Sequence, residues 1–180
     1  MRRQVTRALA WILVVVTAAV AATGCSQTVG GSAQRARPGV PDPERSYGYV
    51  DDRCGLLLDE TIKELLSTDS IVRPYSGAVC QYVLSGPSGL VDVVFSWYET
   101  GSFERERTVA TERGIRITDK DVQRHPAFLA QRPDNVAACS ATAAAGPGVL
   151  AWWVQYRPLN GQNPCDAAEK LLSATLSADM

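Results

Sequence analysis

Hydrophobic residues follow three successive patterns along the chain, and each pattern predicts a different kind of segment. Residues 8–22 form an apolar run of 15 residues with Thr17 as its one polar member, and three arginines precede this run. A helix that spans a membrane needs about 20 apolar residues, so this shorter run favours the hydrophobic region of a signal peptide. Residues 26–49 show no apolar periodicity, whereas residues 50–180 change repeatedly between helical and strand spacing.

The pattern in residues 50–180 predicts three helices. They are expected at about residues 59–66, 103–113 and 164–175. The first helix should bury Leu58 and Ile62 on one face, because the two lie at helical spacing. The last helix has the clearest start, since Asn163 suits the capping position and Pro164 suits the first helical position.

The strand-like segments predict a single sheet. Strands are expected at residues 80–84, 90–98 and 149–156, with shorter ones near 115–117 and 128–130. Both faces of the last strong strand are apolar, so we expect it to be central and covered on both sides. Pro74 and Gly77 indicate a loop after the first helix. The order of elements predicts an α+β domain, with helices packed on a mostly antiparallel sheet and two disulfides stapling it.

A candidate modification site ends the apolar run. Small residues precede Cys25, and the sequence Ala-Thr-Gly-Cys resembles a bacterial lipobox, with Ala22 where Leu is more usual. In a lipobox the cysteine receives a diacylglycerol thioether and becomes the first residue after cleavage. We therefore expect residues 1–24 to be a lipoprotein signal peptide, 25–49 a lipidated flexible tether and 50–180 the folded domain. An ordinary signal peptide with a nearby cysteine is the alternative.

The cysteine count agrees with the lipobox. Five cysteines are present, and lipid on Cys25 leaves an even number for pairing in an oxidising compartment. The short loops favour the bridges Cys54–Cys80 and Cys139–Cys165. The alternative pairing, Cys54–Cys165 with Cys80–Cys139, stays open on sequence spacing alone.

Charge and composition exclude several classes of function. The net charge of −1 becomes −4 without the three leader arginines, which argues against a nucleic-acid-binding protein. His125, the only histidine, is expected at the surface in a polar loop, and no nucleophile elbow surrounds a serine, so no enzyme is expected. One histidine and scattered cysteines make a poor metal site, and no cofactor is expected. Residues 119–121 resemble a solvated turn.

The aromatic residues offer the main candidate for a binding surface. Trp97, Tyr98, Trp152, Trp153 and Tyr156 are expected to form a cluster. A packed core is favoured for most of them over an apolar groove for a lipid or a partner. Tyr98 and Trp153 are the members expected at the surface, and they form the candidate ligand or partner surface.

Several motifs in this order resemble the small actinobacterial Lpr-type lipoproteins, a family of unknown function. The motifs are the lipobox, residues 28–33, Cys54 with its helix, Cys80-Gln81-Tyr82, residues 95–98, residues 104–107, Trp152-Trp153 and Pro164-Cys165-Asp166. The resemblance covers essentially the whole chain. It implies a cell-envelope lipoprotein with two disulfides and supplies no catalytic residues.

These observations lead to one functional expectation and one alternative. We expect a non-enzymatic binding or interaction module, held on the outer face of the cell membrane by lipid on Cys25. Its expected partners are a lipid or an envelope protein. The alternative is an accessory subunit that modulates a membrane transporter or an envelope enzyme.

Overall fold

The computed structural model describes residues 40–178 of the chain. Its elements are β1 (Tyr49–Val50), β2 (Arg53–Cys54), α2 (Asp59–Leu66), β3 (Ser70–Tyr75), β4 (Val79–Gly86), β5 (Gly89–Tyr98), α3 (Phe103–Glu112), β6 (Arg116–Val122), β7 (His125–Gln131), β8 (Ala138–Ala145), β9 (Gly148–Arg157) and α4 (Pro164–Ser177). The expected signal peptide, Cys25 and most of the expected tether lie outside the described residues. Within residues 40–178, no helix is long and apolar enough to cross a membrane.

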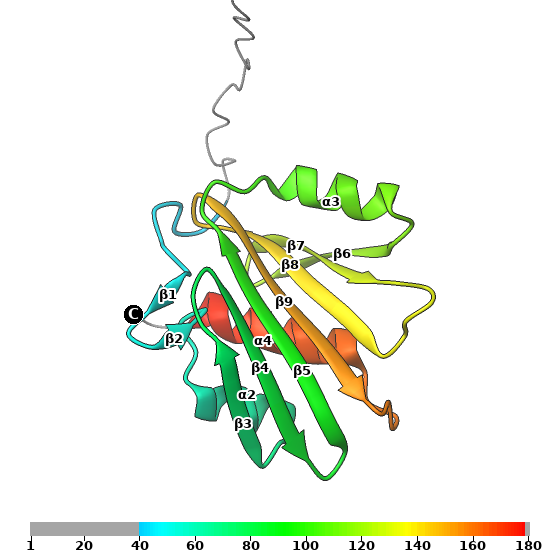
Figure 1. The fold of residues 1–180 in the computed structure, drawn as a ribbon. Helices are drawn as coiled ribbons and strands as arrows, with labels where there is room; N and C mark the ends of the chain where they lie inside the picture. The colour runs from blue at the N-terminus through cyan, green and yellow to red at the C-terminus, as the bar shows by residue number, and fades with distance from the viewer. Residues whose placement is uncertain (1–39, 179–180) are drawn as a thin grey trace, which may run out of the picture. The chain divides into compact units, whose positions relative to one another are not determined.

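Seven of the strands form one antiparallel sheet in the order β3-β4-β5-β9-β8-β7-β6, and β1 pairs only with β2 (Figure 1). This arrangement confirms the expected α+β class. The strand β9 lies at the centre of the sheet, where its two apolar faces predicted it. It pairs with β5 on one side and β8 on the other.

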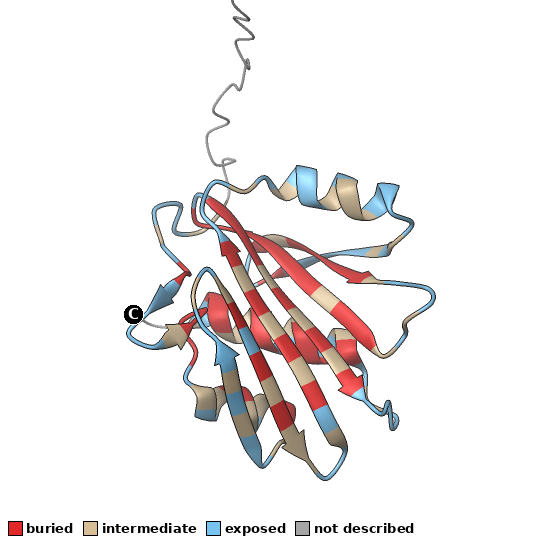
Figure 2. Ribbon diagram, viewed as in Figure 1, coloured by how far each residue is buried: buried red, intermediate tan, exposed pale blue. Residues whose placement is uncertain are grey.

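The helix α4 packs along one face of this sheet, which is the main layer of the core. Trp152 on β9 is fully buried, and its indole Nε1 donates a hydrogen bond to Thr175 Oγ1 of α4 at 2.9 Å. Phe95 of β5 packs on the same indole, with ring centroids 4.9 Å apart. Buried and less buried residues alternate along the central strands, as one covered face requires (Figure 2).

The opposite face of the sheet is covered only in part. Phe103 of α3 contacts Phe128 of β7, with ring centroids 5.4 Å apart. Phe128 pairs with Thr142, which pairs with Ala151 of β9, so α3 lies on the face opposite Trp152 and α4. Over β3, β4, β5 and β9 the side chains on this second face are mostly half-buried or exposed, and none of the three helices within residues 40–178 packs over these four strands on this side. The expectation that β9 is covered on both sides is therefore met on the α4 face only.

Two local expectations differ from the structure. The segment around Pro74 is the edge strand β3 rather than a loop, and its register shifts between Val72 and Tyr75. An edge strand tolerates proline because one row of its backbone donors faces solvent.

Leu58 is 58% exposed, since it stands at the N-cap of α2 ahead of the first turn, and Leu57 is buried in its place.

The last part of the range expected to be tether packs into the domain. Tyr47 is fully buried, and its ring meets Trp97 edge-on at 5.5 Å between centroids. The Arg45 guanidinium lies 5.0 Å from the centre of the Tyr47 ring and donates a hydrogen bond to the carbonyl of Ala178. The packed part of the chain therefore starts before Val50.

Candidate functional site

Both favoured disulfides are present. Cys54–Cys80 joins β2 to β4, and Cys139–Cys165 joins β8 to the first turn of α4. Neither bridge joins two strands that pair with each other in the seven-stranded sheet. The bridges therefore connect the β1–β2 hairpin and α4 to the sheet covalently.

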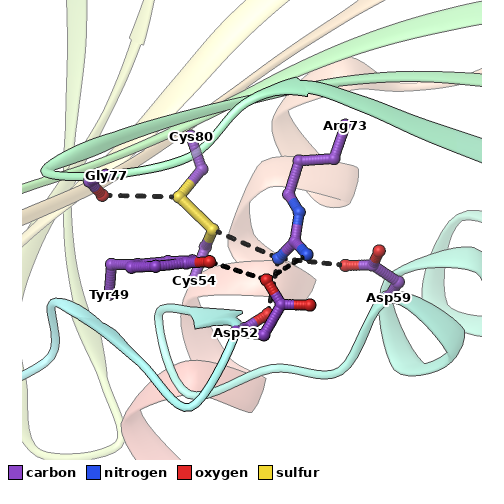
Figure 3. Close-up of a disulfide and its surroundings, with 7 residues drawn as sticks. All are labelled: Tyr49, Asp52, Cys54, Asp59, Arg73, Gly77 and Cys80. Atoms are coloured by element: carbon purple, nitrogen blue, oxygen red, sulfur yellow. Dashed lines mark hydrogen bonds and ion pairs between the residues drawn. A yellow bond between two sulfur atoms is a disulfide. The ribbon is translucent and has the colours of Figure 1, made fainter.

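A polar cluster surrounds the Cys54–Cys80 bridge (Figure 3). Its centre is the side chain of Arg73 on β3, which is only 13% exposed. The guanidinium donates to the carbonyl oxygen of Asp52 at 2.5 Å and to Asp52 Oδ1 at 2.6 Å. It also lies 3.7 Å from Asp59 Oδ1 on α2 and 3.9 Å from the sulfur of Cys54. Arg73 thus connects the hairpin, α2 and the edge of the sheet.

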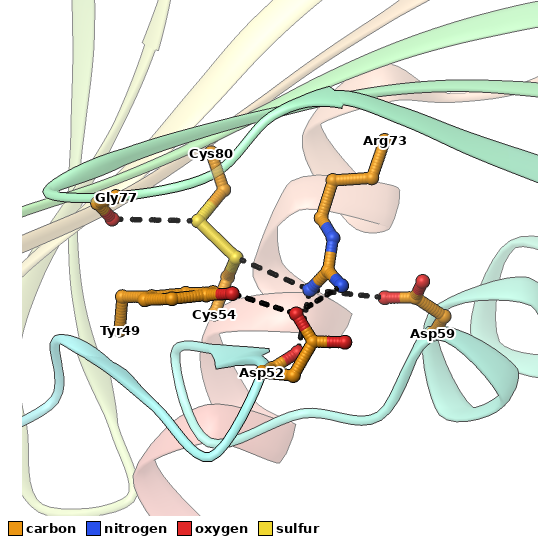
Figure 4. A network of polar contacts seen from close by, with 7 residues as sticks. All are labelled: Tyr49, Asp52, Cys54, Asp59, Arg73, Gly77 and Cys80. Carbon is orange, nitrogen blue, oxygen red and sulfur yellow. Dashed lines mark hydrogen bonds and ion pairs between the residues drawn. A yellow bond between two sulfur atoms is a disulfide. The ribbon is translucent and has the colours of Figure 1, made fainter.

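One guanidinium and two carboxylates face each other in this cluster. The Tyr49 hydroxyl donates to Asp52 Oδ1 at 2.6 Å, and this hydrogen bond, with those from Arg73, holds the pKa of Asp52 below its usual value. In Figure 4 the carboxylates of Asp52 and Asp59 are both directed at the guanidinium. We interpret the cluster as structural, because its donors and acceptors are directed at each other rather than toward a ligand.

His125 does not lie at the surface, as the sequence led us to expect. It begins β7, is 1% exposed, and its Nδ1 lies 2.9 Å from the carbonyl oxygen of Ala144. A carbonyl can only accept, so Nδ1 carries the proton. Burial lowers the pKa of the imidazole. The expectation failed because Pro126 and the polar neighbours suggested a loop, whereas the segment is an interior strand.

Residues 119–121 lie in β6 rather than in a turn. Arg107 of α3 donates to both carboxylate oxygens of Asp119, at 2.9 and 2.8 Å. Lys120 pairs with Glu169 of α4 at 2.9 Å. Residues 40–178 contain no group of three or more His, Cys, Asp or Glu side chains placed to hold a metal ion.

The structure separates the two aromatic residues of the candidate surface. Tyr98 is 51% exposed and Trp153 is half-buried, and both lie on the open face of the sheet. Trp153 pairs with Val94, whereas Tyr98 pairs with Val149. Four residues along β9 correspond to about 13 Å, so the two side chains form no single aromatic site. Trp97, Trp152 and Tyr156 are buried on the other face.

A cavity of about 270 Å³ lies where α2 ends, the β4–β5 hairpin turns and α4 begins. We call it the α4 pocket. It is lined by Leu65, Leu66, Ser67, Thr68, Gly86, Ser88, Gly89, Val91, Tyr156, Gln162, Asn163, Asp166, Ala167 and Lys170. A more open groove of about 590 Å³ adjoins it along α4 and shares Leu65, Asp166 and Lys170. The three segments that form the α4 pocket are far apart in the sequence, so no single sequence motif predicted this pocket.

Tyr156 supplies the phenol on the wall of the α4 pocket. Its side chain is only 7% exposed. Burial raises the pKa of this phenol, so it stays protonated and able to donate. Within residues 40–178 the buried side-chain atoms without a hydrogen-bond partner are Arg45 Nε and the hydroxyls of Tyr47 and Tyr82, and the Tyr156 hydroxyl is not among them. It therefore reaches the cavity, where it can donate to a ligand or to water.

The helix cap beside the α4 pocket follows directly from the sequence. Asn163 Oδ1 accepts a hydrogen bond from the backbone N–H of Cys165 at 3.0 Å, and Pro164 holds the first position of α4. The opposite wall turns at Gly89, whose φ of +106° favours glycine. The cap places Asp166 in the first turn of α4, and Asp166 lines the pocket together with Ser88 and Gly89 of the hairpin.

One comparison with known proteins identifies a family, and its description names no activity. The family model described as "Protein of unknown function (DUF3558)" matches residues 20–178. No curated protein and no solved structure matches the chain. Because the match covers most of its length, this chain belongs to the DUF3558 family.

Proposed function

We propose that this chain is an Lpr-type lipoprotein of the cell envelope, a non-enzymatic module that binds a small ligand in the α4 pocket. Lipid on Cys25 would hold it at the outer face of the cell membrane. Two observations support export and anchoring. The apolar leader ends in a sequence that resembles a lipobox, and the other four cysteines pair as disulfides, which form in oxidising compartments.

The cavity itself carries the binding part of the proposal. Tyr156 brings a protonated hydroxyl to its wall, and this hydroxyl can donate to a ligand from solution. The remaining walls are mostly polar and charged, with Leu65, Leu66, Val91 and Ala167 as their apolar part, and this combination suits a small polar ligand that carries an apolar group. The pocket volume suits a compact ligand rather than a long acyl chain.

The arrangement of reactive groups favours binding over catalysis. His125 donates a hydrogen bond to the carbonyl of Ala144. Within residues 40–178 it accepts no hydrogen bond from a serine or a cysteine. The four cysteines of this region are held in disulfides. No nucleophile–base pair of the kind that acyl transfer needs is therefore found among the described residues.

A blocking variant tests the proposal. The full chain in a mild detergent is screened with a library of small polar compounds by ligand-observed NMR. Ser88→Trp places an indole on the hairpin wall of the α4 pocket, and Thr118→Trp places one on the exposed face of the distant strand β6. We expect compounds that bind the parent protein to lose binding to Ser88→Trp and to keep binding to Thr118→Trp. Binders that are insensitive to Ser88→Trp would contradict the proposal.

The open face of the sheet favours a second candidate, an accessory subunit of an envelope protein. Val72, Tyr75 and Tyr98 all point to this face, and they are 62%, 59% and 51% exposed. Exposed apolar residues of this kind mark protein–protein contacts when they gather on one face. A photocrosslinking residue at Tyr98 that captures one membrane protein in cells, with none captured from Thr118, would favour this candidate.

A further inference from the structure

We propose that the α4 pocket selects a small zwitterion with an apolar side chain, of the free amino acid or dipeptide type. This inference rests on the proposed binding function and names the chemistry of its ligand. It follows from the two charges beside the pocket, the phenol of Tyr156 on its wall, and the apolar part of the walls.

The two charges on the α4 wall are opposite in sign and available. Asp166 and Lys170 lie one turn apart on α4, and both line the pocket and the adjoining groove. Neither forms an ion pair or a side-chain hydrogen bond within residues 40–178, although this spacing often produces a pair on a helix. The neighbouring Lys120 and Glu169 are, by contrast, paired with each other at 2.9 Å. A ligand with one ammonium and one carboxylate would satisfy both free charges.

The start of α4 disfavours a simple anion such as phosphate. A helix N-terminus attracts anions through its unpaired N–H groups. Here Pro164 has no N–H, and the N–H of Cys165 is bonded to Asn163 Oδ1. The carboxylate of Asp166 would also repel a second negative charge at this end. An uncharged polyol would leave both charges unused.

The remaining walls suit a short apolar side chain and a carboxylate. Leu66, Val91 and Ala167 are buried residues that contribute an apolar surface to the cavity. The Tyr156 hydroxyl can donate to the ligand carboxylate, alongside the ammonium of Lys170. The volume of about 270 Å³ equals that of roughly nine waters in the liquid, enough for an amino acid of leucine size.

Charge-matched analogues test this inference on the full chain in a mild detergent. The probes are leucine, N-acetyl-leucine, which lacks the ammonium, and leucinamide, which lacks the carboxylate. Titration calorimetry should show leucine binding at least about fivefold more tightly than either analogue, as expected for one lost charge contact. Ser88→Trp should abolish leucine binding.

Two charge variants link each end of the ligand to a residue. Asp166→Asn should weaken leucine at least about fivefold and leave N-acetyl-leucine unchanged, because that analogue has no ammonium to lose. Lys170→Met should weaken leucine and N-acetyl-leucine and leave leucinamide unchanged. Asp121→Asn, on the outer strand β6, is the matched control and should change none of the three affinities. Circular dichroism checks that each variant is folded.

The outcomes separate this inference from the proposed function. Equal affinities for leucine and its two analogues, with all binding lost in Ser88→Trp, would overturn the zwitterion and leave a pocket that binds ligands. Leucine binding that survives Ser88→Trp, or no leucine binding at all, would also overturn the inference. In the last case, library binders that Ser88→Trp still blocks would keep the pocket as the binding site.

Discussion

At the scale of single residues, buried polar side chains join neighbouring segments of the molecule. Arg73 contacts Asp52, Asp59 and the sulfur of Cys54 with one guanidinium. The Nδ1–H of His125 is directed at the carbonyl of Ala144, on the strand that pairs with its own. The hydroxyls of Tyr47 and Tyr82 differ, because they are buried and have no hydrogen-bond partner among the described residues.

Replacing Arg73 with lysine should destabilise the domain. A lysine ammonium cannot reach both oxygens of Asp52 and the carboxylate of Asp59 with the geometry of the planar fork. We expect Arg73→Lys to lower the free energy of unfolding by about 1–3 kcal/mol in urea titrations. The control is Arg132→Lys, whose pair with Asp134 is exposed and should contribute less than about 1 kcal/mol. Equal losses in the two variants would count against the structural role of Arg73.

His125 should make stability depend on pH. Burial keeps the pKa of the folded imidazole below its ordinary value of 6.5. The hydrogen bond to the Ala144 carbonyl and the charge of Asp42 raise this pKa, whereas Arg124 and Arg45 lower it further. The unfolded chain then binds a proton that the native state excludes, so the free energy of unfolding should fall as the pH drops below about 6.5.

Urea unfolding between pH 8 and pH 4.5 measures this dependence. His125→Phe should flatten the curve in this range. The carboxylates with lowered pKa values, Asp52, Asp119 and Asp134, are exposed and contribute only near and below their ordinary value of 3.8. A curve that has the same slope in His125→Phe would show that another group titrates.

At the scale of elements, the disulfides and the edge strand decide how the helices and the hairpin attach to the sheet. The bridge Cys54–Cys80 attaches the β1–β2 hairpin to β4, next to the contacts of Arg73 from the edge strand β3. The bridge Cys139–Cys165 attaches the start of α4 to β8. Each bridge is local to one end of the sheet, and the two loops do not overlap in the sequence.

Removing either disulfide should cost about the same stability. The two bridges have the same sequence separation, 26 residues, so they restrict the unfolded chain equally. The chain-entropy relation gives about 3–4 kcal/mol for a loop of this length. We expect the double variants Cys54→Ala/Cys80→Ala and Cys139→Ala/Cys165→Ala to lose similar free energies of unfolding in urea. A difference above about 2 kcal/mol would show that native packing, rather than chain entropy, dominates one bridge.

At the scale of the whole molecule, the proposed anchor and the folded domain have different roles. The anchor would keep the domain at the membrane, and the domain would present the α4 pocket and the open face of the sheet. The domain is stabilised by its own core, which includes Tyr47 and the two disulfides. This division predicts that localisation and folding can be changed separately.

Cys25→Ala should remove the protein from the membrane without unfolding it. A single acyl chain binds a membrane only marginally, and the two chains of a lipobox thioether make the attachment stable. We expect the variant in the medium or as an unprocessed precursor, whereas the parent stays in the membrane fraction. Fractionation and mass spectrometry of the N-terminus measure this. A processed variant that still fractionates with membranes would exclude lipid as the anchor.

Local patterns determined most of the elements and the covalent framework of this protein. Alternation along residues 149–156 predicted β9, Asn163 and Pro164 predicted the start of α4, and the parity of the cysteines with short loops favoured the two bridges. These features depend on neighbours in the chain, through side-chain periodicity, capping and loop length. These features can therefore be predicted from the sequence without knowing the order of the strands.

Only the tertiary structure decided what the side chains do once distant segments meet. The edge strand around Pro74 depends on having solvent on one side, and the burial of His125 depends on β8 lying beside β7. The α4 pocket requires the ends of α2, the β4–β5 hairpin and α4 to converge. Strand order and helix placement bring these residues into contact. Because the residues are tens of positions apart in the sequence, no local sequence pattern predicts their contacts.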